Sequence, residues 1–193
     1  VDCTGFRALL IERTLEAGFE DWTHWLPTNA AWAVPSASVG DAHPYTRAIA
    51  HPGGWRWRIP LQHRMGNGLV FSTEYTDPEE ALDEFLGAVE GELLRDPFLV
   101  RFRTGRRKAA WVRNCVAIGL SSGFVEPLES TAIHLIQSAV TRLIQLFPFG
   151  SDCAAQRERY NALARDEIEQ VRDFVVMHYH LTERDDTEFW RYM

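Results

Sequence analysis

The clearest chemistry in the sequence lies in the segment Glu126-Pro127-Leu128-Glu129-Ser130-Thr131. It follows a loop rich in glycine and serine, Gly119 to Gly123, and precedes a long apolar stretch that predicts a helix. A carboxylate at Glu129 beside free backbone N–H groups at a helix start could work next to a bound anion. The plainer interpretation is that Pro127 is the first helical residue and Glu129 complements the helix dipole. The two interpretations are compatible.

Other chemically active side chains give weaker signals. Ser130 and His134 lie four residues apart and could pair as nucleophile and base, but no orienting acid is evident, and packing is the simpler explanation. His178 and His180 are two residues apart, which on a helix points them to different sides, so a metal site is the minor interpretation. The glycine loop can approach a cofactor closely, or it can be a plain connection.

Two tryptophans alternate with arginine in Gly54-Trp55-Arg56-Trp57-Arg58-Ile59-Pro60, which predicts a strand with one apolar face. An aromatic pair of this kind belongs more often to a core than to a site. Seven tryptophans among 193 residues is nevertheless a high count. Several of them could line a cavity for a flat aromatic molecule.

Composition narrows the class of protein. With 193 residues, 46% hydrophobic and 24% charged, the chain can bury a sizeable core. A net charge of −7 argues against a broad nucleic-acid-binding surface. No apolar run reaches the roughly 18 residues that a membrane-spanning helix needs. Three widely spaced cysteines argue against a disulfide framework and favour a reducing cytoplasm. The start at Val1, without methionine or a signal-peptide pattern, predicts a fragment.

The hydrophobic periodicity predicts an α+β fold. Helices are expected over residues 6–17, 76–94, 126–147 and 154–179, and extended segments over 30–34, 55–60, 69–72, 98–102 and 111–118. Asn67-Gly68 predicts a hairpin turn between two of these strands. The helix over 126–147 has more than one apolar stripe, so we expect it to be well buried. The last long helix carries more charge.

Two long motifs resemble the flavin-dependent halogenases, the tryptophan halogenase family. Gly54–Pro60 matches the family's WxWxIP motif, and residues 114–131, NCVAIGLSSGFVEPLEST, resemble the segment that passes the flavin and enters the active-site helix. Supporting matches lie at 2–7, 44–46 and 184–190, so the resemblance covers essentially the whole chain. It implies the C-terminal part of a flavin monooxygenase-like fold of the FAD/NAD(P)-binding Rossmann type, with a substrate-side sheet and long C-terminal helices. Residues 1–193 would form one fragment, with flavin-flanking strands and the sheet in 1–125 and the active-site helix and helical region in 126–193.

The resemblance also implies a reaction. FAD reduced by a separate reductase would react with dioxygen and oxidise chloride or bromide, and the oxidant would halogenate an electron-rich aromatic such as indole or tryptophan. Glu129 corresponds to the catalytic carboxylate, with Ser130 between the flavin and substrate sides. The backbone of Thr131 and Ala132 would contact the halide, and Ala132 stands where the family usually has glycine.

The remaining site residues are assigned by the same resemblance. Cofactor contacts fall on Asp2, Gly119, Leu120 and Ile133. The tunnel wall that keeps substrate from the flavin falls on Trp55, Trp57, Ile59 and Pro60. Substrate contacts fall on His178, Tyr179, Phe189 and Trp190, with Tyr179 and Phe189 placed to sandwich a ring. No metal is implied.

Two family features are missing from the chain, the GxGxxG dinucleotide motif and the active-site lysine. The only lysine, Lys108, lies in the wrong segment, so this chain alone should be inactive. The expected partners are a small aromatic substrate and a separate flavin reductase, with no nucleic acid and no membrane. The expected location is the cytoplasm, and a homodimer is a possible assembly. The alternatives are a flavin-dependent monooxygenase-like hydroxylase and a non-catalytic binding module. The tryptophan wall argues against the hydroxylase.

Overall fold

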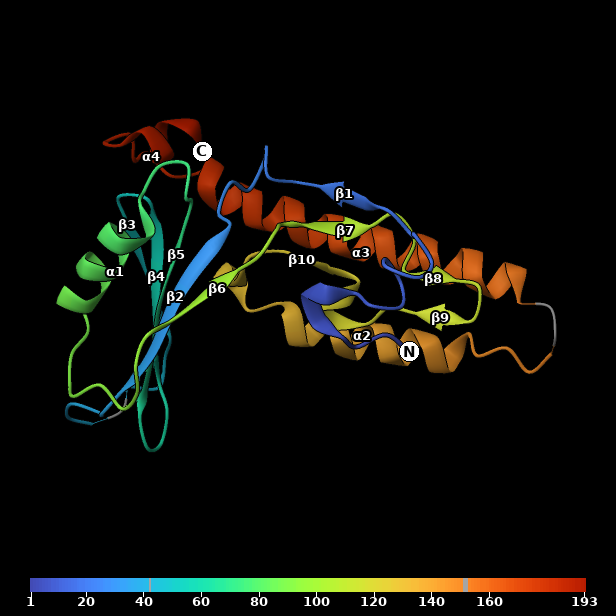
Figure 1. Cartoon of the computed structure of the whole chain (residues 1–193), viewed down its shortest axis with the longest axis horizontal. Coiled ribbons are helices and arrows are strands. Elements are labelled where there is room, and N and C mark those ends of the chain that lie inside the picture. Colours follow the sequence, from blue (N-terminus) through green and yellow to red (C-terminus); the bar gives the residue numbers. More distant parts are fainter. Residues whose placement is uncertain (42, 151–152) are drawn as a thin grey trace. The chain divides into compact units, whose positions relative to one another are not determined.

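The computed structural model describes residues 1–41, 43–150 and 153–193 and has the predicted α+β composition (Figure 1). Contacts divide the chain into two compact units. The first unit contains Val1–Leu26 and Arg103–Leu181, and the second contains Pro27–Phe102 and Thr182–Met193. Each unit therefore combines segments that are far apart in sequence. The sequence analysis divides the chain after residue 125 by the expected role of each part. The contact units do not test that division, which stays a prediction.

The second unit is built on a five-stranded antiparallel sheet with the order β3-β4-β5-β2-β6. The strands are β2 (Ala30–Ser36), β3 (Arg47–His51), β4 (Gly54–Pro60), β5 (Met65–Phe71) and β6 (Phe98–Arg101). The strands predicted at 30–34, 55–60 and 98–102 are thus confirmed. Each is rich in apolar residues, as half-buried strands are.

One face of this sheet packs against α1 (Pro78–Gly87). The helix begins as the sequence predicts, because the Asp77 carboxylate accepts a hydrogen bond from the Glu79 N–H at 2.8 Å and Pro78 is the first helical residue. It ends at Gly87, earlier than the predicted residue 94. Its buried side chains, Ala81 and Phe85, form one apolar cluster with Ala30, Val34, Leu69 and Phe71.

The opposite face of the sheet carries the two tryptophans of β4. Residues directly opposite in an antiparallel pair share a face, and the register pairs Trp55 with Val70 and Trp57 with Gly68. Small residues of the neighbouring strands occupy the same face: Ala31, Ala33, Ala48 and Ala50. Small neighbours leave room for two indole rings, whose centroids lie 6.0 Å apart.

The predicted hairpin turn at Asn67-Gly68 is wrong. Both residues lie inside β5, and the turn is made earlier, where the Leu61 N–H donates to the Arg64 carbonyl at 2.9 Å. The Asn67 side chain donates to Ser36 Oγ at 3.0 Å and so binds β5 to β2. Gly68 is needed for space, because a Cβ atom built there would lie 1.9 Å from the Trp57 ring.

The C-terminal helix α4 (Glu188–Tyr192) completes the second unit. The Trp190 indole N–H donates to the His51 carbonyl at 2.7 Å, and the Thr187 hydroxyl donates to the Pro52 carbonyl at 2.8 Å. Phe189 packs edge-on against Tyr75, with ring centroids 5.8 Å apart. These contacts fasten α4 to the end of β3.

The first unit has two small antiparallel sheets. One contains β1 (Phe19–Asp21), β7 (Gly105–Arg107) and β10 (Gly123–Phe124), and the other contains β8 (Trp111–Val112) and β9 (Cys115–Val116). The single strand predicted over 111–118 is therefore wrong, because the chain folds back at Arg113, whose φ is 52°. The helix predicted over 6–17 is also wrong. A 3-10 turn at Gly5–Arg7 is followed by turns, with Ala8 in the left-handed region at φ 44°.

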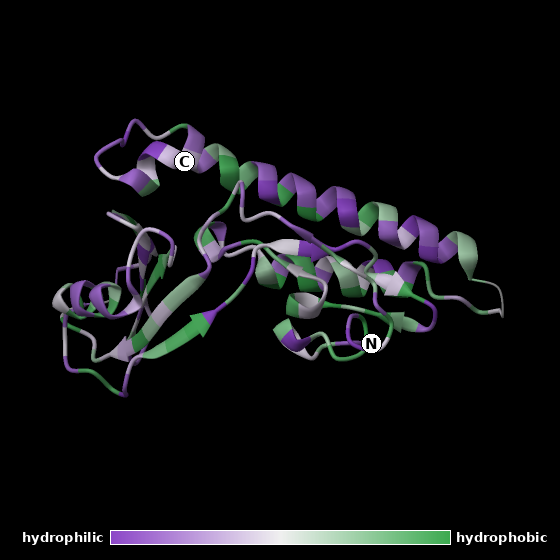
Figure 2. Ribbon diagram, turned by 45° about the horizontal axis from the view of Figure 1, so that its top comes forward, coloured by the Kyte–Doolittle hydropathy of each residue, from purple (hydrophilic) through white to green (hydrophobic). Residues whose placement is uncertain are grey.

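Two long helices, α2 (Ala132–Gln145) and α3 (Ala154–His180), run along the first unit. The prediction of α3 is confirmed, and its mixed polar and apolar character shows as alternating purple and green in Figure 2. Arg142 of α2 pairs with Glu167 of α3 at 2.5 Å, and Arg106 of β7 pairs with Glu169 of α3 at 2.6 Å.

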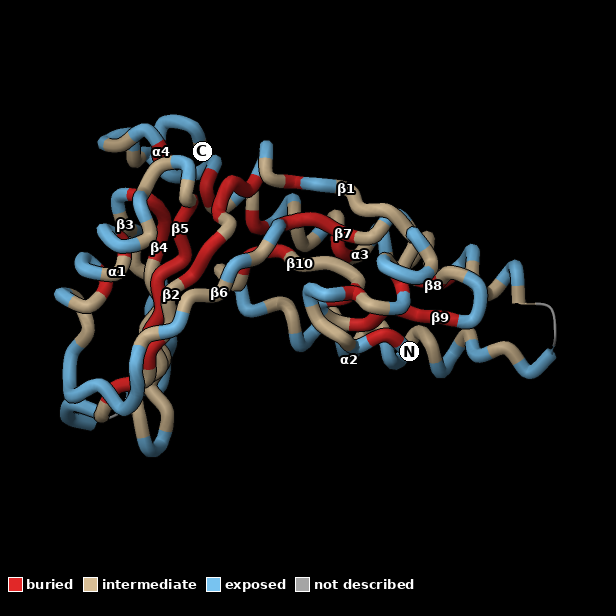
Figure 3. The backbone as a smooth tube through the Cα atoms, in the orientation of Figure 1, coloured by how far each residue is buried: buried red, intermediate tan, exposed pale blue. Residues whose placement is uncertain are grey.

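The expected burial of the helix over 126–147 is wrong. No residue of α2 is buried, and the helix carries no red in Figure 3. Ile133 and Ile144 are each 69% exposed. The apolar stripe predicted from the sequence exists, but the described residues leave much of it uncovered.

The contact between Trp57 and Gly68 predicts a large difference between two glycines of β5. Gly68→Ala should destabilise the protein by about 1–3 kcal/mol, because the new methyl group must displace the Trp57 ring. Gly66→Ala is the matched control, since a Cβ there meets Ile59 only at ordinary distances of 3.6 and 3.7 Å. Urea unfolding followed by tryptophan fluorescence measures both. Equal stability of the two variants would contradict the packing described.

Candidate functional site

The segment that carries Glu129 is a separate turn ahead of α2. Pro127–Glu129 forms one 3-10 turn, and Ser130 then takes the left-handed conformation, with φ 54° and ψ 32°. The Ser130 N–H donates to the Pro127 carbonyl at 2.9 Å and closes this turn. Pro127 is thus the first residue of a helical turn, as predicted, but that turn is a separate 3-10 turn, and Glu129 lies outside the first turn of α2.

The N-terminus of α2 has no side-chain cap. Thr131 is the N-cap residue, but its side chain makes no capping hydrogen bond. Helix geometry leaves the first N–H groups without intrahelical acceptors, and the helix dipole places positive potential there. The backbone of Thr131 and Ala132, where the sequence predicts halide contact, lies at this end.

Residues of the last turn of α3 contact both glutamates of the motif, Glu126 and Glu129. The Tyr179 hydroxyl donates to Glu126 Oε1 at 2.6 Å, and Glu126 is fully buried. His178 Nε2 lies 2.9 Å from Glu129 Oε1. The side chains of His178 and Glu129 remain 34% and 37% exposed, so a ligand can still reach Glu129.

Sequence reasoning assigned no role to Glu126, and the structure makes it the anchor of the turn. The available signal was a glutamate among the apolar residues that precede the helix. A carboxylate buried in such surroundings needs a hydrogen-bond partner. Tyr179, predicted to bind substrate, is 3% exposed and supplies that partner.

The backbone of Asp2 holds the loop that begins at Gly119 through hydrogen bonds. The Asp2 carbonyl accepts hydrogen bonds from Ser121 Oγ at 2.6 Å and from the Ile118 N–H at 3.0 Å. Arg107 donates from Nε to the Ser121 carbonyl at 3.0 Å. Gly119 itself has φ +74°, a conformation that favours glycine.

The Asp2 carboxylate is engaged by its own loop. One oxygen accepts from the N–H and the hydroxyl of Thr4, and the other accepts from the N–H groups of Leu10 and Ile11, all within 2.9 Å. Burial raises the pKa of Asp2, but the hydrogen bonds from Ile11, Thr4 and Leu10 outweigh it and lower the pKa from 3.8 to about 2. The Asp2 side chain thus organises the loop, and a cofactor contact by Asp2 stays a prediction.

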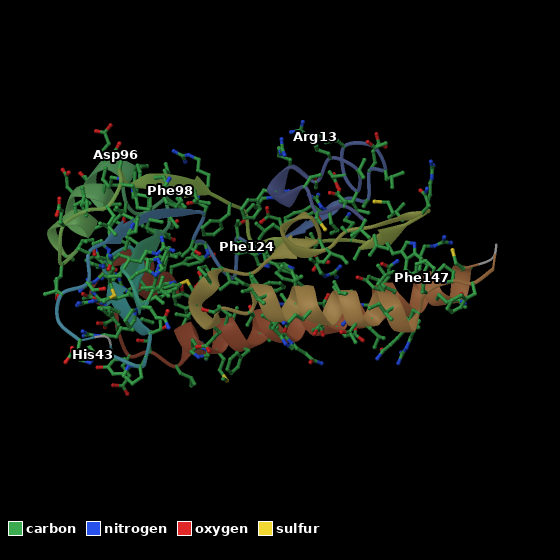
Figure 4. The ribbon with its side chains drawn as sticks, turned by 90° about the horizontal axis from the view of Figure 1, so that it is seen from below. Arg13, His43, Asp96, Phe98, Phe124 and Phe147 are labelled. Atoms are coloured by element: carbon green, nitrogen blue, oxygen red, sulfur yellow. The ribbon has the colours of Figure 1, made fainter. Side chains whose placement is uncertain are left out.

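A mainly apolar cavity of about 250 Å³ lies between α2, α3 and the strands of the first unit. Its lining includes Gly119, Leu120, Phe124, Ala132, Ile136 and Tyr160. Phe124, labelled in Figure 4, also packs edge-on against Phe6 with centroids 5.4 Å apart. Burial raises the pKa of Tyr160 to about 12, so its phenol stays neutral. The cavity lining brings together Gly119 and Leu120, which are predicted to contact the cofactor, and Ala132, which is predicted to contact the halide.

The predicted wall and part of the predicted substrate contacts lie in the second unit, away in sequence from Glu129. Trp55 is 4% exposed and belongs to the core, whereas Trp57 is half-buried. Phe189 and Trp190 are also buried, at 1% and 7% exposed. Their assignments as wall and substrate residues stay predictions, as does the ring sandwich.

Within residues 1–41, 43–150 and 153–193, no three His, Cys, Asp or Glu side chains are grouped so as to hold a metal ion. Among the described residues no helix is both long and apolar enough to span a bilayer.

Comparison with known proteins identifies relatives over the whole chain. The family model described as tryptophan halogenase matches residues 1–193. Tryptophan 6-halogenase SttH of Streptomyces toxytricini is 42% identical over 99% of this chain and 37% of its own length. Among solved structures, the flavin-dependent halogenase Xcc4156 from Xanthomonas campestris is 51% identical, with a TM-score of 0.96 over 99% of this chain and 38% of that one. BrvH, a flavin-dependent halogenase from Brevundimonas sp. BAL3, is 49% identical, with a TM-score of 0.93 over 98% of this chain and 39% of that one. The chain thus spans less than two fifths of the length of these relatives.

The hydrogen bonds to Asp2 predict a pH-dependent contribution to stability. Because its pKa is about 2 in the folded protein and 3.8 normally, the ionised carboxylate stabilises the fold by roughly 2 kcal/mol above about pH 4. This contribution should disappear as the pH falls from about 4 towards 2. Asp2→Asn replaces one of the two accepting oxygens by an amide NH2, which cannot accept from the N–H groups on its side, so this variant should lose the contribution at pH 7.

Urea unfolding at pH 7 and pH 3 measures this effect. The control is Asp166→Asn, which changes an exposed aspartate on α3. A deficit of Asp2→Asn that is the same at both pH values would contradict the assignment.

Proposed function

The chain belongs to the tryptophan halogenase family, and on that premise we propose that the whole protein is a flavin-dependent halogenase. Its reaction would place chloride or bromide on an electron-rich aromatic ring, with indole and tryptophan as the first candidates. The observation that carries the proposal is the exposed Glu129 carboxylate, held just ahead of the uncapped N-terminus of α2. This arrangement offers a proton acceptor next to an anion-binding helix end.

The first unit offers a surface suited to a flavin ring. Leu120 is 37% exposed and Ile133 is 69% exposed, so both present apolar side chains that can flank a flat ring. Gly119 adds a position without a side chain. With these residues holding it, FAD reduced by a separate reductase would supply, with dioxygen, the oxidation that turns the halide into an electrophile.

The chain's own groups then have distinct tasks. The N–H groups at Thr131 and Ala132 hold the halide, and Ala132 keeps its backbone N–H although the family usually has glycine there. Glu129 accepts the proton when the halogenated ring restores its aromaticity, so that the ring C–H bond breaks and a carboxyl O–H bond forms. Ser130 would lie between the flavin side and the substrate side. By the family resemblance, the wall that keeps substrate from the flavin would consist of Trp55, Trp57, Ile59 and Pro60.

We also propose that the enzyme acts on a small aromatic substrate and receives reduced flavin from a separate reductase. Its location would be cytoplasmic, and the assembly to test is a homodimer. The active-site lysine and the GxGxxG motif are not among these 193 residues, so the activity proposed is that of the whole protein.

The reaction can be tested directly with the full-length gene product. FAD, a flavin reductase, NADH and either bromide or chloride are supplied with indole or tryptophan, and the products are analysed by mass spectrometry. A halogen isotope pattern in the product is expected. Hydroxylated product would support the monooxygenase alternative, and no product with either substrate would oppose the proposed substrates.

Glu129→Gln tests the role of the carboxylate in the same assay. We expect turnover to fall by about 10²-fold or more, because glutamine cannot accept the ring proton. FAD binding, followed by quenching of flavin fluorescence, should not change. Turnover equal to that of the wild type would remove Glu129 from its assigned role.

A further inference from the structure

The last turn of α3 makes a second contact whose purpose the buried Tyr179–Glu126 bond does not explain. His178 Nε2 lies 2.9 Å from Glu129 Oε1, while both side chains keep about a third of their surface exposed. An exposed ion pair of this kind contributes little to the stability of a fold. Tyr179 and Glu126 already hold the turn from the buried side.

The surroundings of the His178 ring fix where its protons are. Nδ1 lies 2.8 Å from the Phe174 carbonyl, which can only accept a hydrogen bond, so Nδ1 carries a hydrogen. Nε2 faces a carboxylate oxygen. A neutral ring and an ionised Glu129 would bring two lone pairs together, so one proton lies between Nε2 and Oε1. For Glu129 to act as a base, this proton must belong to the His178 ring, which then donates from Nε2 to Oε1.

The ring is also held in place. The Phe174 ring stands edge-on to the His178 ring, with centroids 4.7 Å apart and planes at 88°. Phe174 thus supplies both a carbonyl acceptor and an aromatic contact one turn earlier on α3. The His178 ring is therefore oriented before it meets Glu129.

The two oxygens of Glu129 are consequently unequal. Oε1 is engaged by His178, and within the described residues no hydrogen bond reaches Oε2. We propose that His178 is a positioning residue, which holds Glu129 by Oε1 so that Oε2 faces the aromatic ring and takes its proton. This inference rests on the proposed halogenase function, because it needs Glu129 as the base. In that step the ring C–H bond breaks, its electron pair returns to the ring, and an Oε2–H bond forms.

This role differs from the substrate contact that the family resemblance assigns to His178. Both ring nitrogens are already engaged, so only carbon atoms of the ring could touch a substrate. A substrate-binding residue acts mainly on KM, whereas a residue that positions the base acts on kcat. Kinetics therefore distinguishes the two roles, because a change of His178 would alter mainly KM in the first and mainly kcat in the second.

The kinetic test uses the full-length protein. We expect His178→Phe to lower kcat roughly tenfold with KM changed by less than about twofold, because the carboxylate loses its orientation. His178→Gln, which can still donate to Oε1, should recover part of the loss. The matched control is His180→Phe, an exposed histidine of the same helix turn, which should behave like the wild type. A rise in KM with unchanged kcat would overturn the proposal.

A double-mutant cycle shows whether His178 acts through Glu129. In the Glu129→Gln background, His178→Phe should change kcat by less than about twofold, since the base that it positions is gone. An equal tenfold loss in both backgrounds would show an independent role and overturn the proposal. Melting temperatures of all variants separate these effects from unfolding.

A spectroscopic measurement tests the pair without any turnover. Nitrogen-15 NMR of labelled histidine should show the His178 Nε2 signal shifting in Glu129→Gln, while the His180 signals stay in place. An unchanged His178 signal would overturn the pair itself. If the wild type makes hydroxylated instead of halogenated product, the proposed function fails and the base-positioning role fails with it, whereas the NMR result still decides whether the pair exists.

Discussion

The geometry of the proposed site depends on one buried hydrogen bond, from the Tyr179 hydroxyl to Glu126 Oε1. Glu126 is fully buried, and a buried carboxylate that loses a donor is costly to the fold. The bond therefore fixes the chain immediately before Pro127. From that point the 3-10 turn, the left-handed Ser130 and the start of α2 follow within six residues. Because adjacent residues on a helix point about 100° apart, His178 reaches the second glutamate of the same turn.

The sequence identified the family more reliably than the local structure. The motif around Glu129 and the alternation at Trp55 and Trp57 carry residue types in a recognisable order, and the family assignment from them is confirmed. The helix break at Ser130 had no such marker, because a left-handed serine costs only about 1–2 kcal/mol, which tertiary contacts can offset. Periodicity likewise reported the apolar stripe of α2 but not what covers it.

Tertiary packing also reversed the strongest turn signal in the sequence. Asn-Gly favours a two-residue hairpin, yet here Asn67 bonds to β2 and Gly68 leaves space for the Trp57 ring. The same packing shows how each tryptophan is buried. Trp55 is core at 4% exposed, and Trp57, packed over Gly68, is half-buried. The wall that the family resemblance assigns to these residues stays a prediction.

Environment distinguishes the two glutamates of one short motif. Glu126 and Glu129 are chemically identical and three residues apart, and only the family resemblance, not spacing or periodicity, separates them in the sequence. Glu126 is fully buried and bonded to a tyrosine hydroxyl, which suits an anchor. Glu129 is 37% exposed and is held through one oxygen by a histidine, which suits a base that must meet a substrate. The difference arises because the motif crosses the end of α3, so that one carboxylate turns inward and the other stays at the surface.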